Sequence, residues 1–100
     1  MYLISTSFHT SKHIVDEIKE IVRKVYIPML EKAEIFHNIR MLRIMVEIDP
    51  ETRSFAVQYE TEDIEKANQW ANQDAKKLFG ILHNRYGEKL VHFTTPMEIE

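Results

Sequence analysis

The side chains that could perform chemistry in this chain do not form a recognisable catalytic motif. They are polar residues set singly into apolar runs, at positions that we expect to share one face of a β-sheet: Ser5, Ser7, Arg43, Gln58, Glu60 and His92. A histidine can transfer a proton near neutral pH, and an arginine can hold a carboxylate or an enolate. If these side chains converge in an enclosed cavity, they form a candidate ligand-binding or catalytic site.

The same residues also fit a purely structural role. Arg43 could form an ion pair with Glu47 or Glu60 that bridges two protomers. Polar groups at such an interface need partners whether or not a ligand binds. We favour this structural interpretation, and the catalytic residues stay unassigned.

The sequence offers no recognisable metal site. It contains no cysteine, and a zinc site needs three or four convergent ligands. His9 and His13 lie where a strand ends and a helix begins, so they do not share a helix face, and we expect His37 and His83 at the surface. We therefore expect no metal and no cofactor. A haem protein, a third possibility, would need an axial histidine with space beside it.

Two aromatic residues could line a binding pocket, but packing explains them better. Trp70 lies on the apolar stripe of a predicted helix, where an aromatic side chain is typically part of the core. Tyr26 comes shortly before Pro28, and a proline kink could open a pocket beside it. We expect Tyr26 to pack at the end of its helix.

The composition is that of one globular domain, and it excludes several classes of partner. The chain has 100 residues, which we divide into a domain at 1–96 and a polar tail at 97–100. It carries 13 Lys and Arg against 16 Asp and Glu, without a basic stripe, so we expect no nucleic-acid partner. The apolar run at 1–8 is too short for a signal peptide or a membrane span, so we expect a cytoplasmic protein.

The hydrophobic pattern predicts the elements that must position these residues. Alternating apolar residues predict strands at 2–8, 36–48, 54–59 and 89–95. Apolar residues at steps of three and four predict helices at 14–29 and 64–86, the first disturbed by Pro28. The order β-α-β-β-α-β predicts an α+β ferredoxin-like sandwich. Its four-stranded antiparallel sheet has the order 4-1-3-2, with both helices on one face.

Two helices leave the other face of the sheet, called here the open face, uncovered. With the helix stripes as a guide to strand register, we expect the helices to cover Ile4, Phe8, Leu42, Ile44, Val46, Phe55, Val57, Tyr59, Val91 and Phe93. The open face then receives the six polar residues together with Leu3, Met41, Met45, Ala56, Leu90 and Thr94. Its apolar members, Leu3, Met41, Met45 and Leu90, form a patch too large for a solvated surface. We therefore expect a homodimer formed through this face.

Several short stretches resemble a known group of proteins. They are Ile27-Pro28, Met41-Leu42-Arg43-Ile44, Ala56-Val57-Gln58-Tyr59, Arg85-Tyr86-Gly87-Glu88-Lys89 and Val91-His92-Phe93. Across nearly the whole chain they are similar to the small bacterial domain-of-unknown-function family 4286, within the dimeric α/β-barrel superfamily. The chain departs from the pattern at Tyr26, where a histidine is expected, and at His92, where a small residue is commoner.

The resemblance implies a dimeric α/β barrel without implying one activity. The wider superfamily includes cofactor-free monooxygenases, lactone isomerases, haem enzymes and ligand-sensing domains, and a fold shared by so many functions cannot select one. Our first hypothesis is a non-catalytic homodimeric module that binds a small molecule or a protein. The alternative is a cofactor-independent monooxygenase or isomerase, which requires a buried His92 or Tyr59 with a shifted pKa beside a real cavity.

Overall fold

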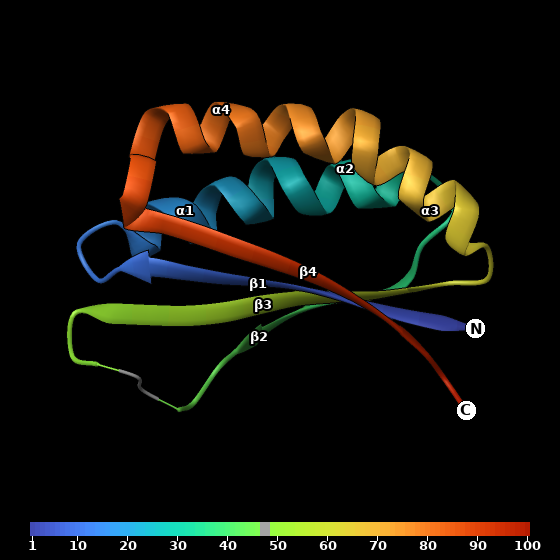
Figure 1. Ribbon diagram of the computed structural model, residues 1–100, viewed down its shortest axis with the longest axis horizontal. Helices are drawn as coiled ribbons and strands as arrows, with labels where there is room; N and C mark the ends of the chain where they lie inside the picture. The colour runs from blue at the N-terminus through green and yellow to red at the C-terminus, as the bar shows by residue number, and fades with distance from the viewer. Residues whose placement is uncertain (47–48) are drawn as a thin grey trace.

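The protein is a two-layer sandwich of helices on a four-stranded antiparallel sheet (Figure 1). The computed structural model describes residues 1–46 and 49–100. The sheet has the order β2-β3-β1-β4, and its strands are β1 (Tyr2–Ser11), β2 (His37–Arg43), β3 (Thr52–Thr61) and β4 (Leu90–Glu98). This is the predicted order read from the other edge, so the predicted α+β ferredoxin-like fold is confirmed.

All the helices lie on one face of this sheet and form two rods, each interrupted by a π-helical turn (Figure 1). The first rod consists of α1 (Val15–Ile21), the π turn η1 (Val22–Tyr26) and α2 (Ile27–Lys32). The second consists of α3 (Ile64–Trp70), the π turn η2 (Ala71–Ala75) and α4 (Lys76–Tyr86). A 3₁₀ turn, η3 (Gly87–Lys89), then leads into β4. Gly87 ends α4 with φ 57° and ψ −134°, a positive-φ conformation that glycine adopts without strain.

Pro28 explains the interruption in the first rod. It stands near the start of α2, and its missing N–H cannot donate to a carbonyl in the preceding turn. The π turn directly before it absorbs this break, so the predicted disturbance at Pro28 interrupts the regular α-helix without ending the rod. The core between the helices and the sheet contains several aromatic pairs: Phe8 stacks on Phe55 at 4.9 Å between ring centroids. Trp70 is 8% exposed and meets the Phe36 ring edge-on at 5.0 Å, so its predicted place in the core is confirmed.

The two central strands have the predicted facing. Ile4 pairs with Tyr59 and Phe8 pairs with Phe55, and all four side chains are buried beneath the helices. Ser5 and Ser7, which alternate with these helix-facing residues along β1, lie on the open face with their partners Gln58 and Ala56.

The predicted facing of β2 is wrong, because a β-bulge reverses it. The pairing with β3 shifts between His37 and Arg40, and Asn38 in this interval has a φ of 51°. One extra residue in a strand sends all later side chains to the opposite face. Met41 and Arg43 therefore lie on the helix side, and Leu42 lies on the open face.

The predicted length of β2 is also wrong. The strand ends at Arg43, so Met45 and Val46, which are 80% and 74% exposed, belong to neither sheet face. Ile44, the other covered residue predicted here, also lies past the end of the strand and is half-buried. Glu47 and Ile48, and with them the predicted Glu47 ion pair, lie outside the described residues.

The predicted facing of β4 is wrong as well. Phe8 pairs with His92, which places Leu90, His92 and Thr94 on the helix side and Val91 and Phe93 on the open face. Leu90 is 2% exposed and closes one end of the core, whereas Phe93 is 60% exposed. On the helix side of this edge strand, the Phe79 ring of α4 lies 4.1 Å from the His92 ring, centroid to centroid, and Thr94 takes the next position on the same face. The strand also continues to Glu98, so the first half of the predicted tail pairs with β1.

Candidate functional site

A pocket of about 430 Å³ opens between the second helical rod and the β4 edge of the sheet. We call it the helix–sheet pocket. Its walls combine apolar surface from the helices with polar side chains from the sheet, and it is lined by Tyr26, Tyr59, Ala71, Asn72, Ala75, Lys76, Phe79, Gly80, His83, His92 and Thr94. Its size and lining are those of a small-molecule site.

Four hydroxyl groups from four different elements form what we call the hydroxyl cluster, in which Tyr26, Tyr59 and Thr94 line one side of the pocket and Thr6 is buried behind them. Tyr26 from η1 and Tyr59 from β3 bring their hydroxyl oxygens within 3.0 Å of each other. Thr6 from β1 lies 3.2 Å from the Tyr26 hydroxyl and 3.0 Å from that of Thr94 on β4. Thr6, Tyr26 and Tyr59 are each at most 3% exposed, so Thr94 connects a buried network to the pocket opening.

The two tyrosines of the cluster remain protonated at physiological pH. Burial raises the pKa of Tyr26 well above its ordinary value, and the neighbouring Tyr59 adds to this effect. Burial likewise raises the pKa of Tyr59. The cluster therefore acts through hydrogen bonds rather than through a tyrosinate anion.

The π turns position residues of this site. Tyr26 is the last residue of η1, and Ala71, Asn72 and Ala75 belong to η2. A π turn adds a residue to a helical turn and redirects the side chains around it, and such turns are frequent at functional sites. Here the first turn directs Tyr26 down to the sheet, while the second passes over the pocket.

Gly80 keeps the mouth of the pocket open. It lies in the middle of α4, where a glycine costs about 1 kcal/mol relative to alanine. A β-carbon at this position would meet no atom within 4 Å, so tight packing does not require the glycine. The missing side chain leaves space at the pocket lining.

A pair of histidines forms the other polar part of the pocket. His83 Nε2 lies 2.8 Å from His92 Nδ1, and the His92 ring lies over Phe79 with 4.1 Å between centroids. Burial, and then the nearby charge of His83, lowers the pKa of His92 below its ordinary value. His92 is therefore neutral at pH 7, with one ring nitrogen as a donor and the other as an acceptor.

A family model described as "Domain of unknown function (DUF4286)" matches residues 1–100. The chain belongs to the DUF4286 family. No curated protein matches the sequence of this DUF4286 domain.

Solved structures share the fold of the DUF4286 domain at low sequence identity. HapK from Hahella chejuensis has a TM-score of 0.71 at 11% identity, over 100% of this chain and 93% of that one. An antibiotic biosynthesis monooxygenase has a TM-score of 0.64 at 13% identity, over 100% and 99%. A dimeric ferredoxin-like protein from an uncultured marine organism has a TM-score of 0.60 at 13% identity, over 99% and 94%. At these identities the likeness shows the fold alone.

The DUF4286 domain does not gather the six predicted site residues into one cavity. Ser5, Ser7, Gln58 and Glu60 lie on the open face. Arg43 and His92 lie on the helix side, but on β2 and β4, the two opposite edge strands. Of the six, only His92 lines the helix–sheet pocket.

Most of the residues of the DUF4286 domain that were predicted to form a dimer interface do not lie on the open face. Leu3 lies on the open face as expected, whereas Leu90 is in the core and Met41 packs against it from the helix side. Met45 lies past the end of β2.

Sequence reasoning missed several residues of the DUF4286 pocket. His83 was expected at the surface, yet the short η3 connection brings α4 back to β4 and places His83 beside His92. Thr6 and Gly80 belong to no motif or spacing that would mark them as functional residues in the sequence. Tyr26, expected only to pack, is both buried and part of the pocket lining.

Residues 1–46 and 49–100 contain neither a metal-ligand cluster nor a membrane-spanning helix. No group of three or more histidine, cysteine or acidic side chains there could hold a metal ion. None of the helices in those ranges is long and apolar enough to cross a membrane.

Proposed function

We propose that this protein is a homodimeric module that binds a small, flat organic molecule bearing a hydroxyl group. The observation that carries this proposal is the helix–sheet pocket, in which apolar walls enclose the hydroxyl cluster. The ligand would lie between Phe79 and the sheet, with its hydroxyl directed to the cluster.

The hydrogen-bond capacity of the cluster selects the polar group of the ligand. Four hydroxyls supply four protons and eight lone pairs. The four contacts within the cluster, the longest at 3.5 Å between Thr6 and Tyr59, require at most four protons and four lone pairs, so lone pairs remain unused. Thr94, which has a single partner in the cluster, can therefore accept a hydrogen bond from a ligand O–H. Aromatic rings at the wall favour an aromatic or conjugated body.

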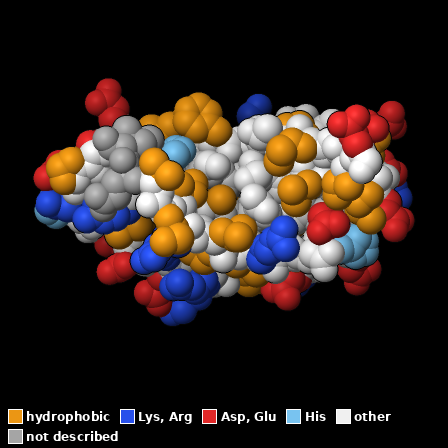
Figure 2. Space-filling view, turned by 90° about the horizontal axis from the view of Figure 1, so that it is seen from below, with side chains coloured by type: hydrophobic (Ala, Val, Ile, Leu, Met, Phe, Trp, Pro, Cys, Tyr) orange, Lys and Arg blue, Asp and Glu red, His pale blue; other side chains and the backbone are white. Residues whose placement is uncertain are grey.

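The open face supports the dimer. Figure 2 shows this face from below, with hydrophobic side chains spread over its middle between white side-chain and backbone atoms and a few charged side chains. Phe93, Val91, Met97 and Leu42 are 60%, 42%, 39% and 37% exposed there. An apolar area of this kind is typical of an interface, and two neighbours of this fold are described as dimeric ferredoxin-like proteins.

A pocket-filling variant tests the binding function. We expect naphthol to shift the amide NMR signals of α4 and β4 in the unmodified protein. Gly80→Leu should abolish this binding, because the leucine enters the open space at the pocket mouth. It should also retain or raise stability by up to about 1 kcal/mol, since leucine is a better helix former than glycine.

Asn84→Leu is the matched control, since Asn84 is an exposed residue one turn further along α4 and does not line the pocket. It should leave binding unchanged. Binding that survives in Gly80→Leu would show that naphthol occupies another place.

A second function is favoured by His92. A neutral imidazole in the pocket can accept the proton of a phenol or enol, and the resulting anion is the form that a cofactor-independent oxygenase or isomerase activates. As an oxygenase, the protein would consume dissolved oxygen when a phenolic probe is added in air. As an isomerase, it would convert the probe to an isomer. His92→Gln should lower this rate about a hundredfold while binding is retained. Release of the probe unchanged would favour the binding module.

A further inference from the structure

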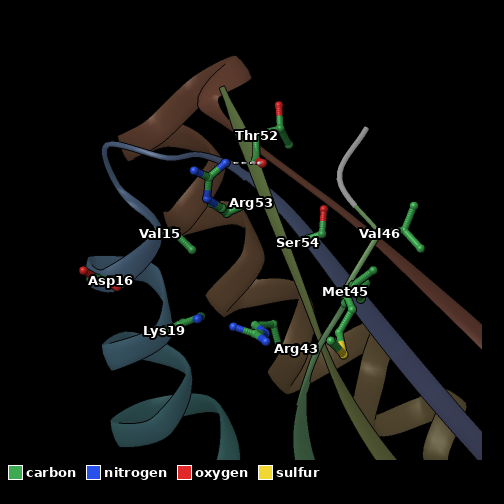
Figure 3. Close-up of a pocket in the computed structure, with 10 residues that line it drawn as sticks. Val15, Asp16, Lys19, Arg43, Met45, Val46, Thr52, Arg53 and Ser54 are labelled. Carbon is green, nitrogen blue, oxygen red and sulfur yellow. Dashed lines mark hydrogen bonds between the residues drawn. The ribbon is translucent and has the colours of Figure 1, made fainter. Parts of the chain in front are cut away.

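A second concave site lies at the other edge of the sheet, where α1 faces the β2–β3 hairpin. We call this region, of about 630 Å³, the hairpin pocket (Figure 3). The charged residues among its described lining are Lys19, Arg43, Arg53 and Asp16. Three cations against one carboxylate make this lining positive, in a protein whose net charge is −3.

Two of these cations face each other. Lys19 comes from α1 and Arg43 from the end of β2, and Figure 3 shows their charged groups pointing toward one another across the pocket. Lys19 Nζ lies 5.9 Å above the Phe55 ring. In the described part of the chain, neither side chain has an ion pair or a hydrogen bond to another side chain. The carboxyl of Asp16 points away from this space (Figure 3).

The third cation is fixed to the backbone of the hairpin. Arg53 Nη1 donates to the carbonyl oxygens of Pro50 at 3.0 Å and Thr52 at 3.1 Å. This holds a positive guanidinium at the side of the pocket, whereas Lys19 and Arg43 are the charges directed across it. Facing like charges repel, and a bound anion would turn this repulsion into attraction.

We propose that the hairpin pocket binds a small organic dianion, a phosphate monoester or a dicarboxylate, between Lys19 and Arg43. The planar Arg43 fork suits two oxygens of one anionic group, and Lys19 supplies a point charge from the opposite wall. Arg43 would then have the anion-holding role that the sequence analysis weighed against an ion pair, in a different cavity from His92. It is independent of the helix–sheet pocket, with which it shares no lining residue.

The test is an amide NMR titration of the full chain with inorganic phosphate and, separately, with succinate at constant ionic strength. We expect saturable shifts centred on Lys19 and Arg43 with at least one probe, and the tighter probe distinguishes a phosphoryl from a dicarboxylate ligand. Arg43→Gln and Lys19→Gln should each weaken binding about tenfold, the loss typical of a charged hydrogen bond.

Arg40→Gln is the matched control, because Arg40 lies on the same strand but pairs with Gln58 on the open face. It should bind as the unmodified protein does, and so should Gly80→Leu, whose change lies in the other pocket. If Arg40→Gln weakened anion binding equally, the loss would be explained by the change in net charge, and the proposal would be overturned. So would linear, unsaturable shifts with both probes.

Discussion

At the scale of single residues, His92 carries the most specific chemistry of the helix–sheet pocket. Its pKa is lowered first by burial and second by the charge of His83. We therefore expect an NMR titration of the imidazole signals to give His92 a pKa below 6.5, the ordinary value. Because burial is the larger cause, His83→Gln should raise this pKa only part of the way. If the pKa of His92 returned to the ordinary value in that variant, His83 rather than burial would be the main cause of the lowered pKa.

The same shift predicts how stability depends on pH. A histidine whose pKa is lower in the folded state than in the unfolded state binds fewer protons when folded. The contribution of His92 is therefore fully present above its unfolded pKa, and it is lost as pH falls through the folded pKa. Denaturant unfolding from pH 8 to pH 5 should show a steeper loss in the unmodified protein than in His92→Phe. Parallel curves for the two proteins would contradict the assignment.

At the scale of the elements, helix termini and edge strands carry the deviations from regular geometry. Glu34 follows α2 with a φ of 61°, the left-handed conformation that glycine adopts without strain. Glu34→Gly should raise the free energy of unfolding by roughly 0.5–1 kcal/mol, measured by denaturant titration. Glu31→Gly, inside α2, is the control and should lower it by about 1 kcal/mol. Destabilisation by both changes would show that Glu34 is not strained.

The elements also show what could be predicted from sequence. The side chains of the central strands β1 and β3 were assigned to the correct sheet faces. Each of these strands has a neighbouring strand on both sides, and its apolar alternation matches the helix stripes. The edge strands were reversed for two physical reasons. The bulge beside Asn38 leaves no signal in an apolar pattern. In β4, Val91 and Phe93 turn outward because the open face is itself apolar.

The candidate site was predictable only in part, for the same reason. His92 and Tyr59 were named as residues that would matter if buried beside a cavity, and both line the helix–sheet pocket. The hydroxyl cluster joins positions as distant as Thr6 and Thr94, which only the strand pairing brings together. No spacing along the chain reveals such a contact.

At the scale of the whole molecule, the open face makes the strongest prediction. Phe93→Asp should raise the dimer dissociation constant at least tenfold in sedimentation equilibrium, because it places an unpaired carboxylate within the proposed interface. Ile81→Asp changes a side chain of similar exposure, 64%, on α4 at the helix side, and it should leave the constant unchanged. Equal effects of the two changes would remove the open face from the interface.

The central claim is that the helix–sheet pocket is the binding site, and intermolecular NOEs between bound naphthol and the protein test it most directly. We predict NOEs from the naphthol ring to Phe79 and Ala71, and from its hydroxyl-bearing edge to Thr94, all of which line the pocket. NOEs to Phe93 and Leu42 instead would place the ligand on the open face and contradict the account.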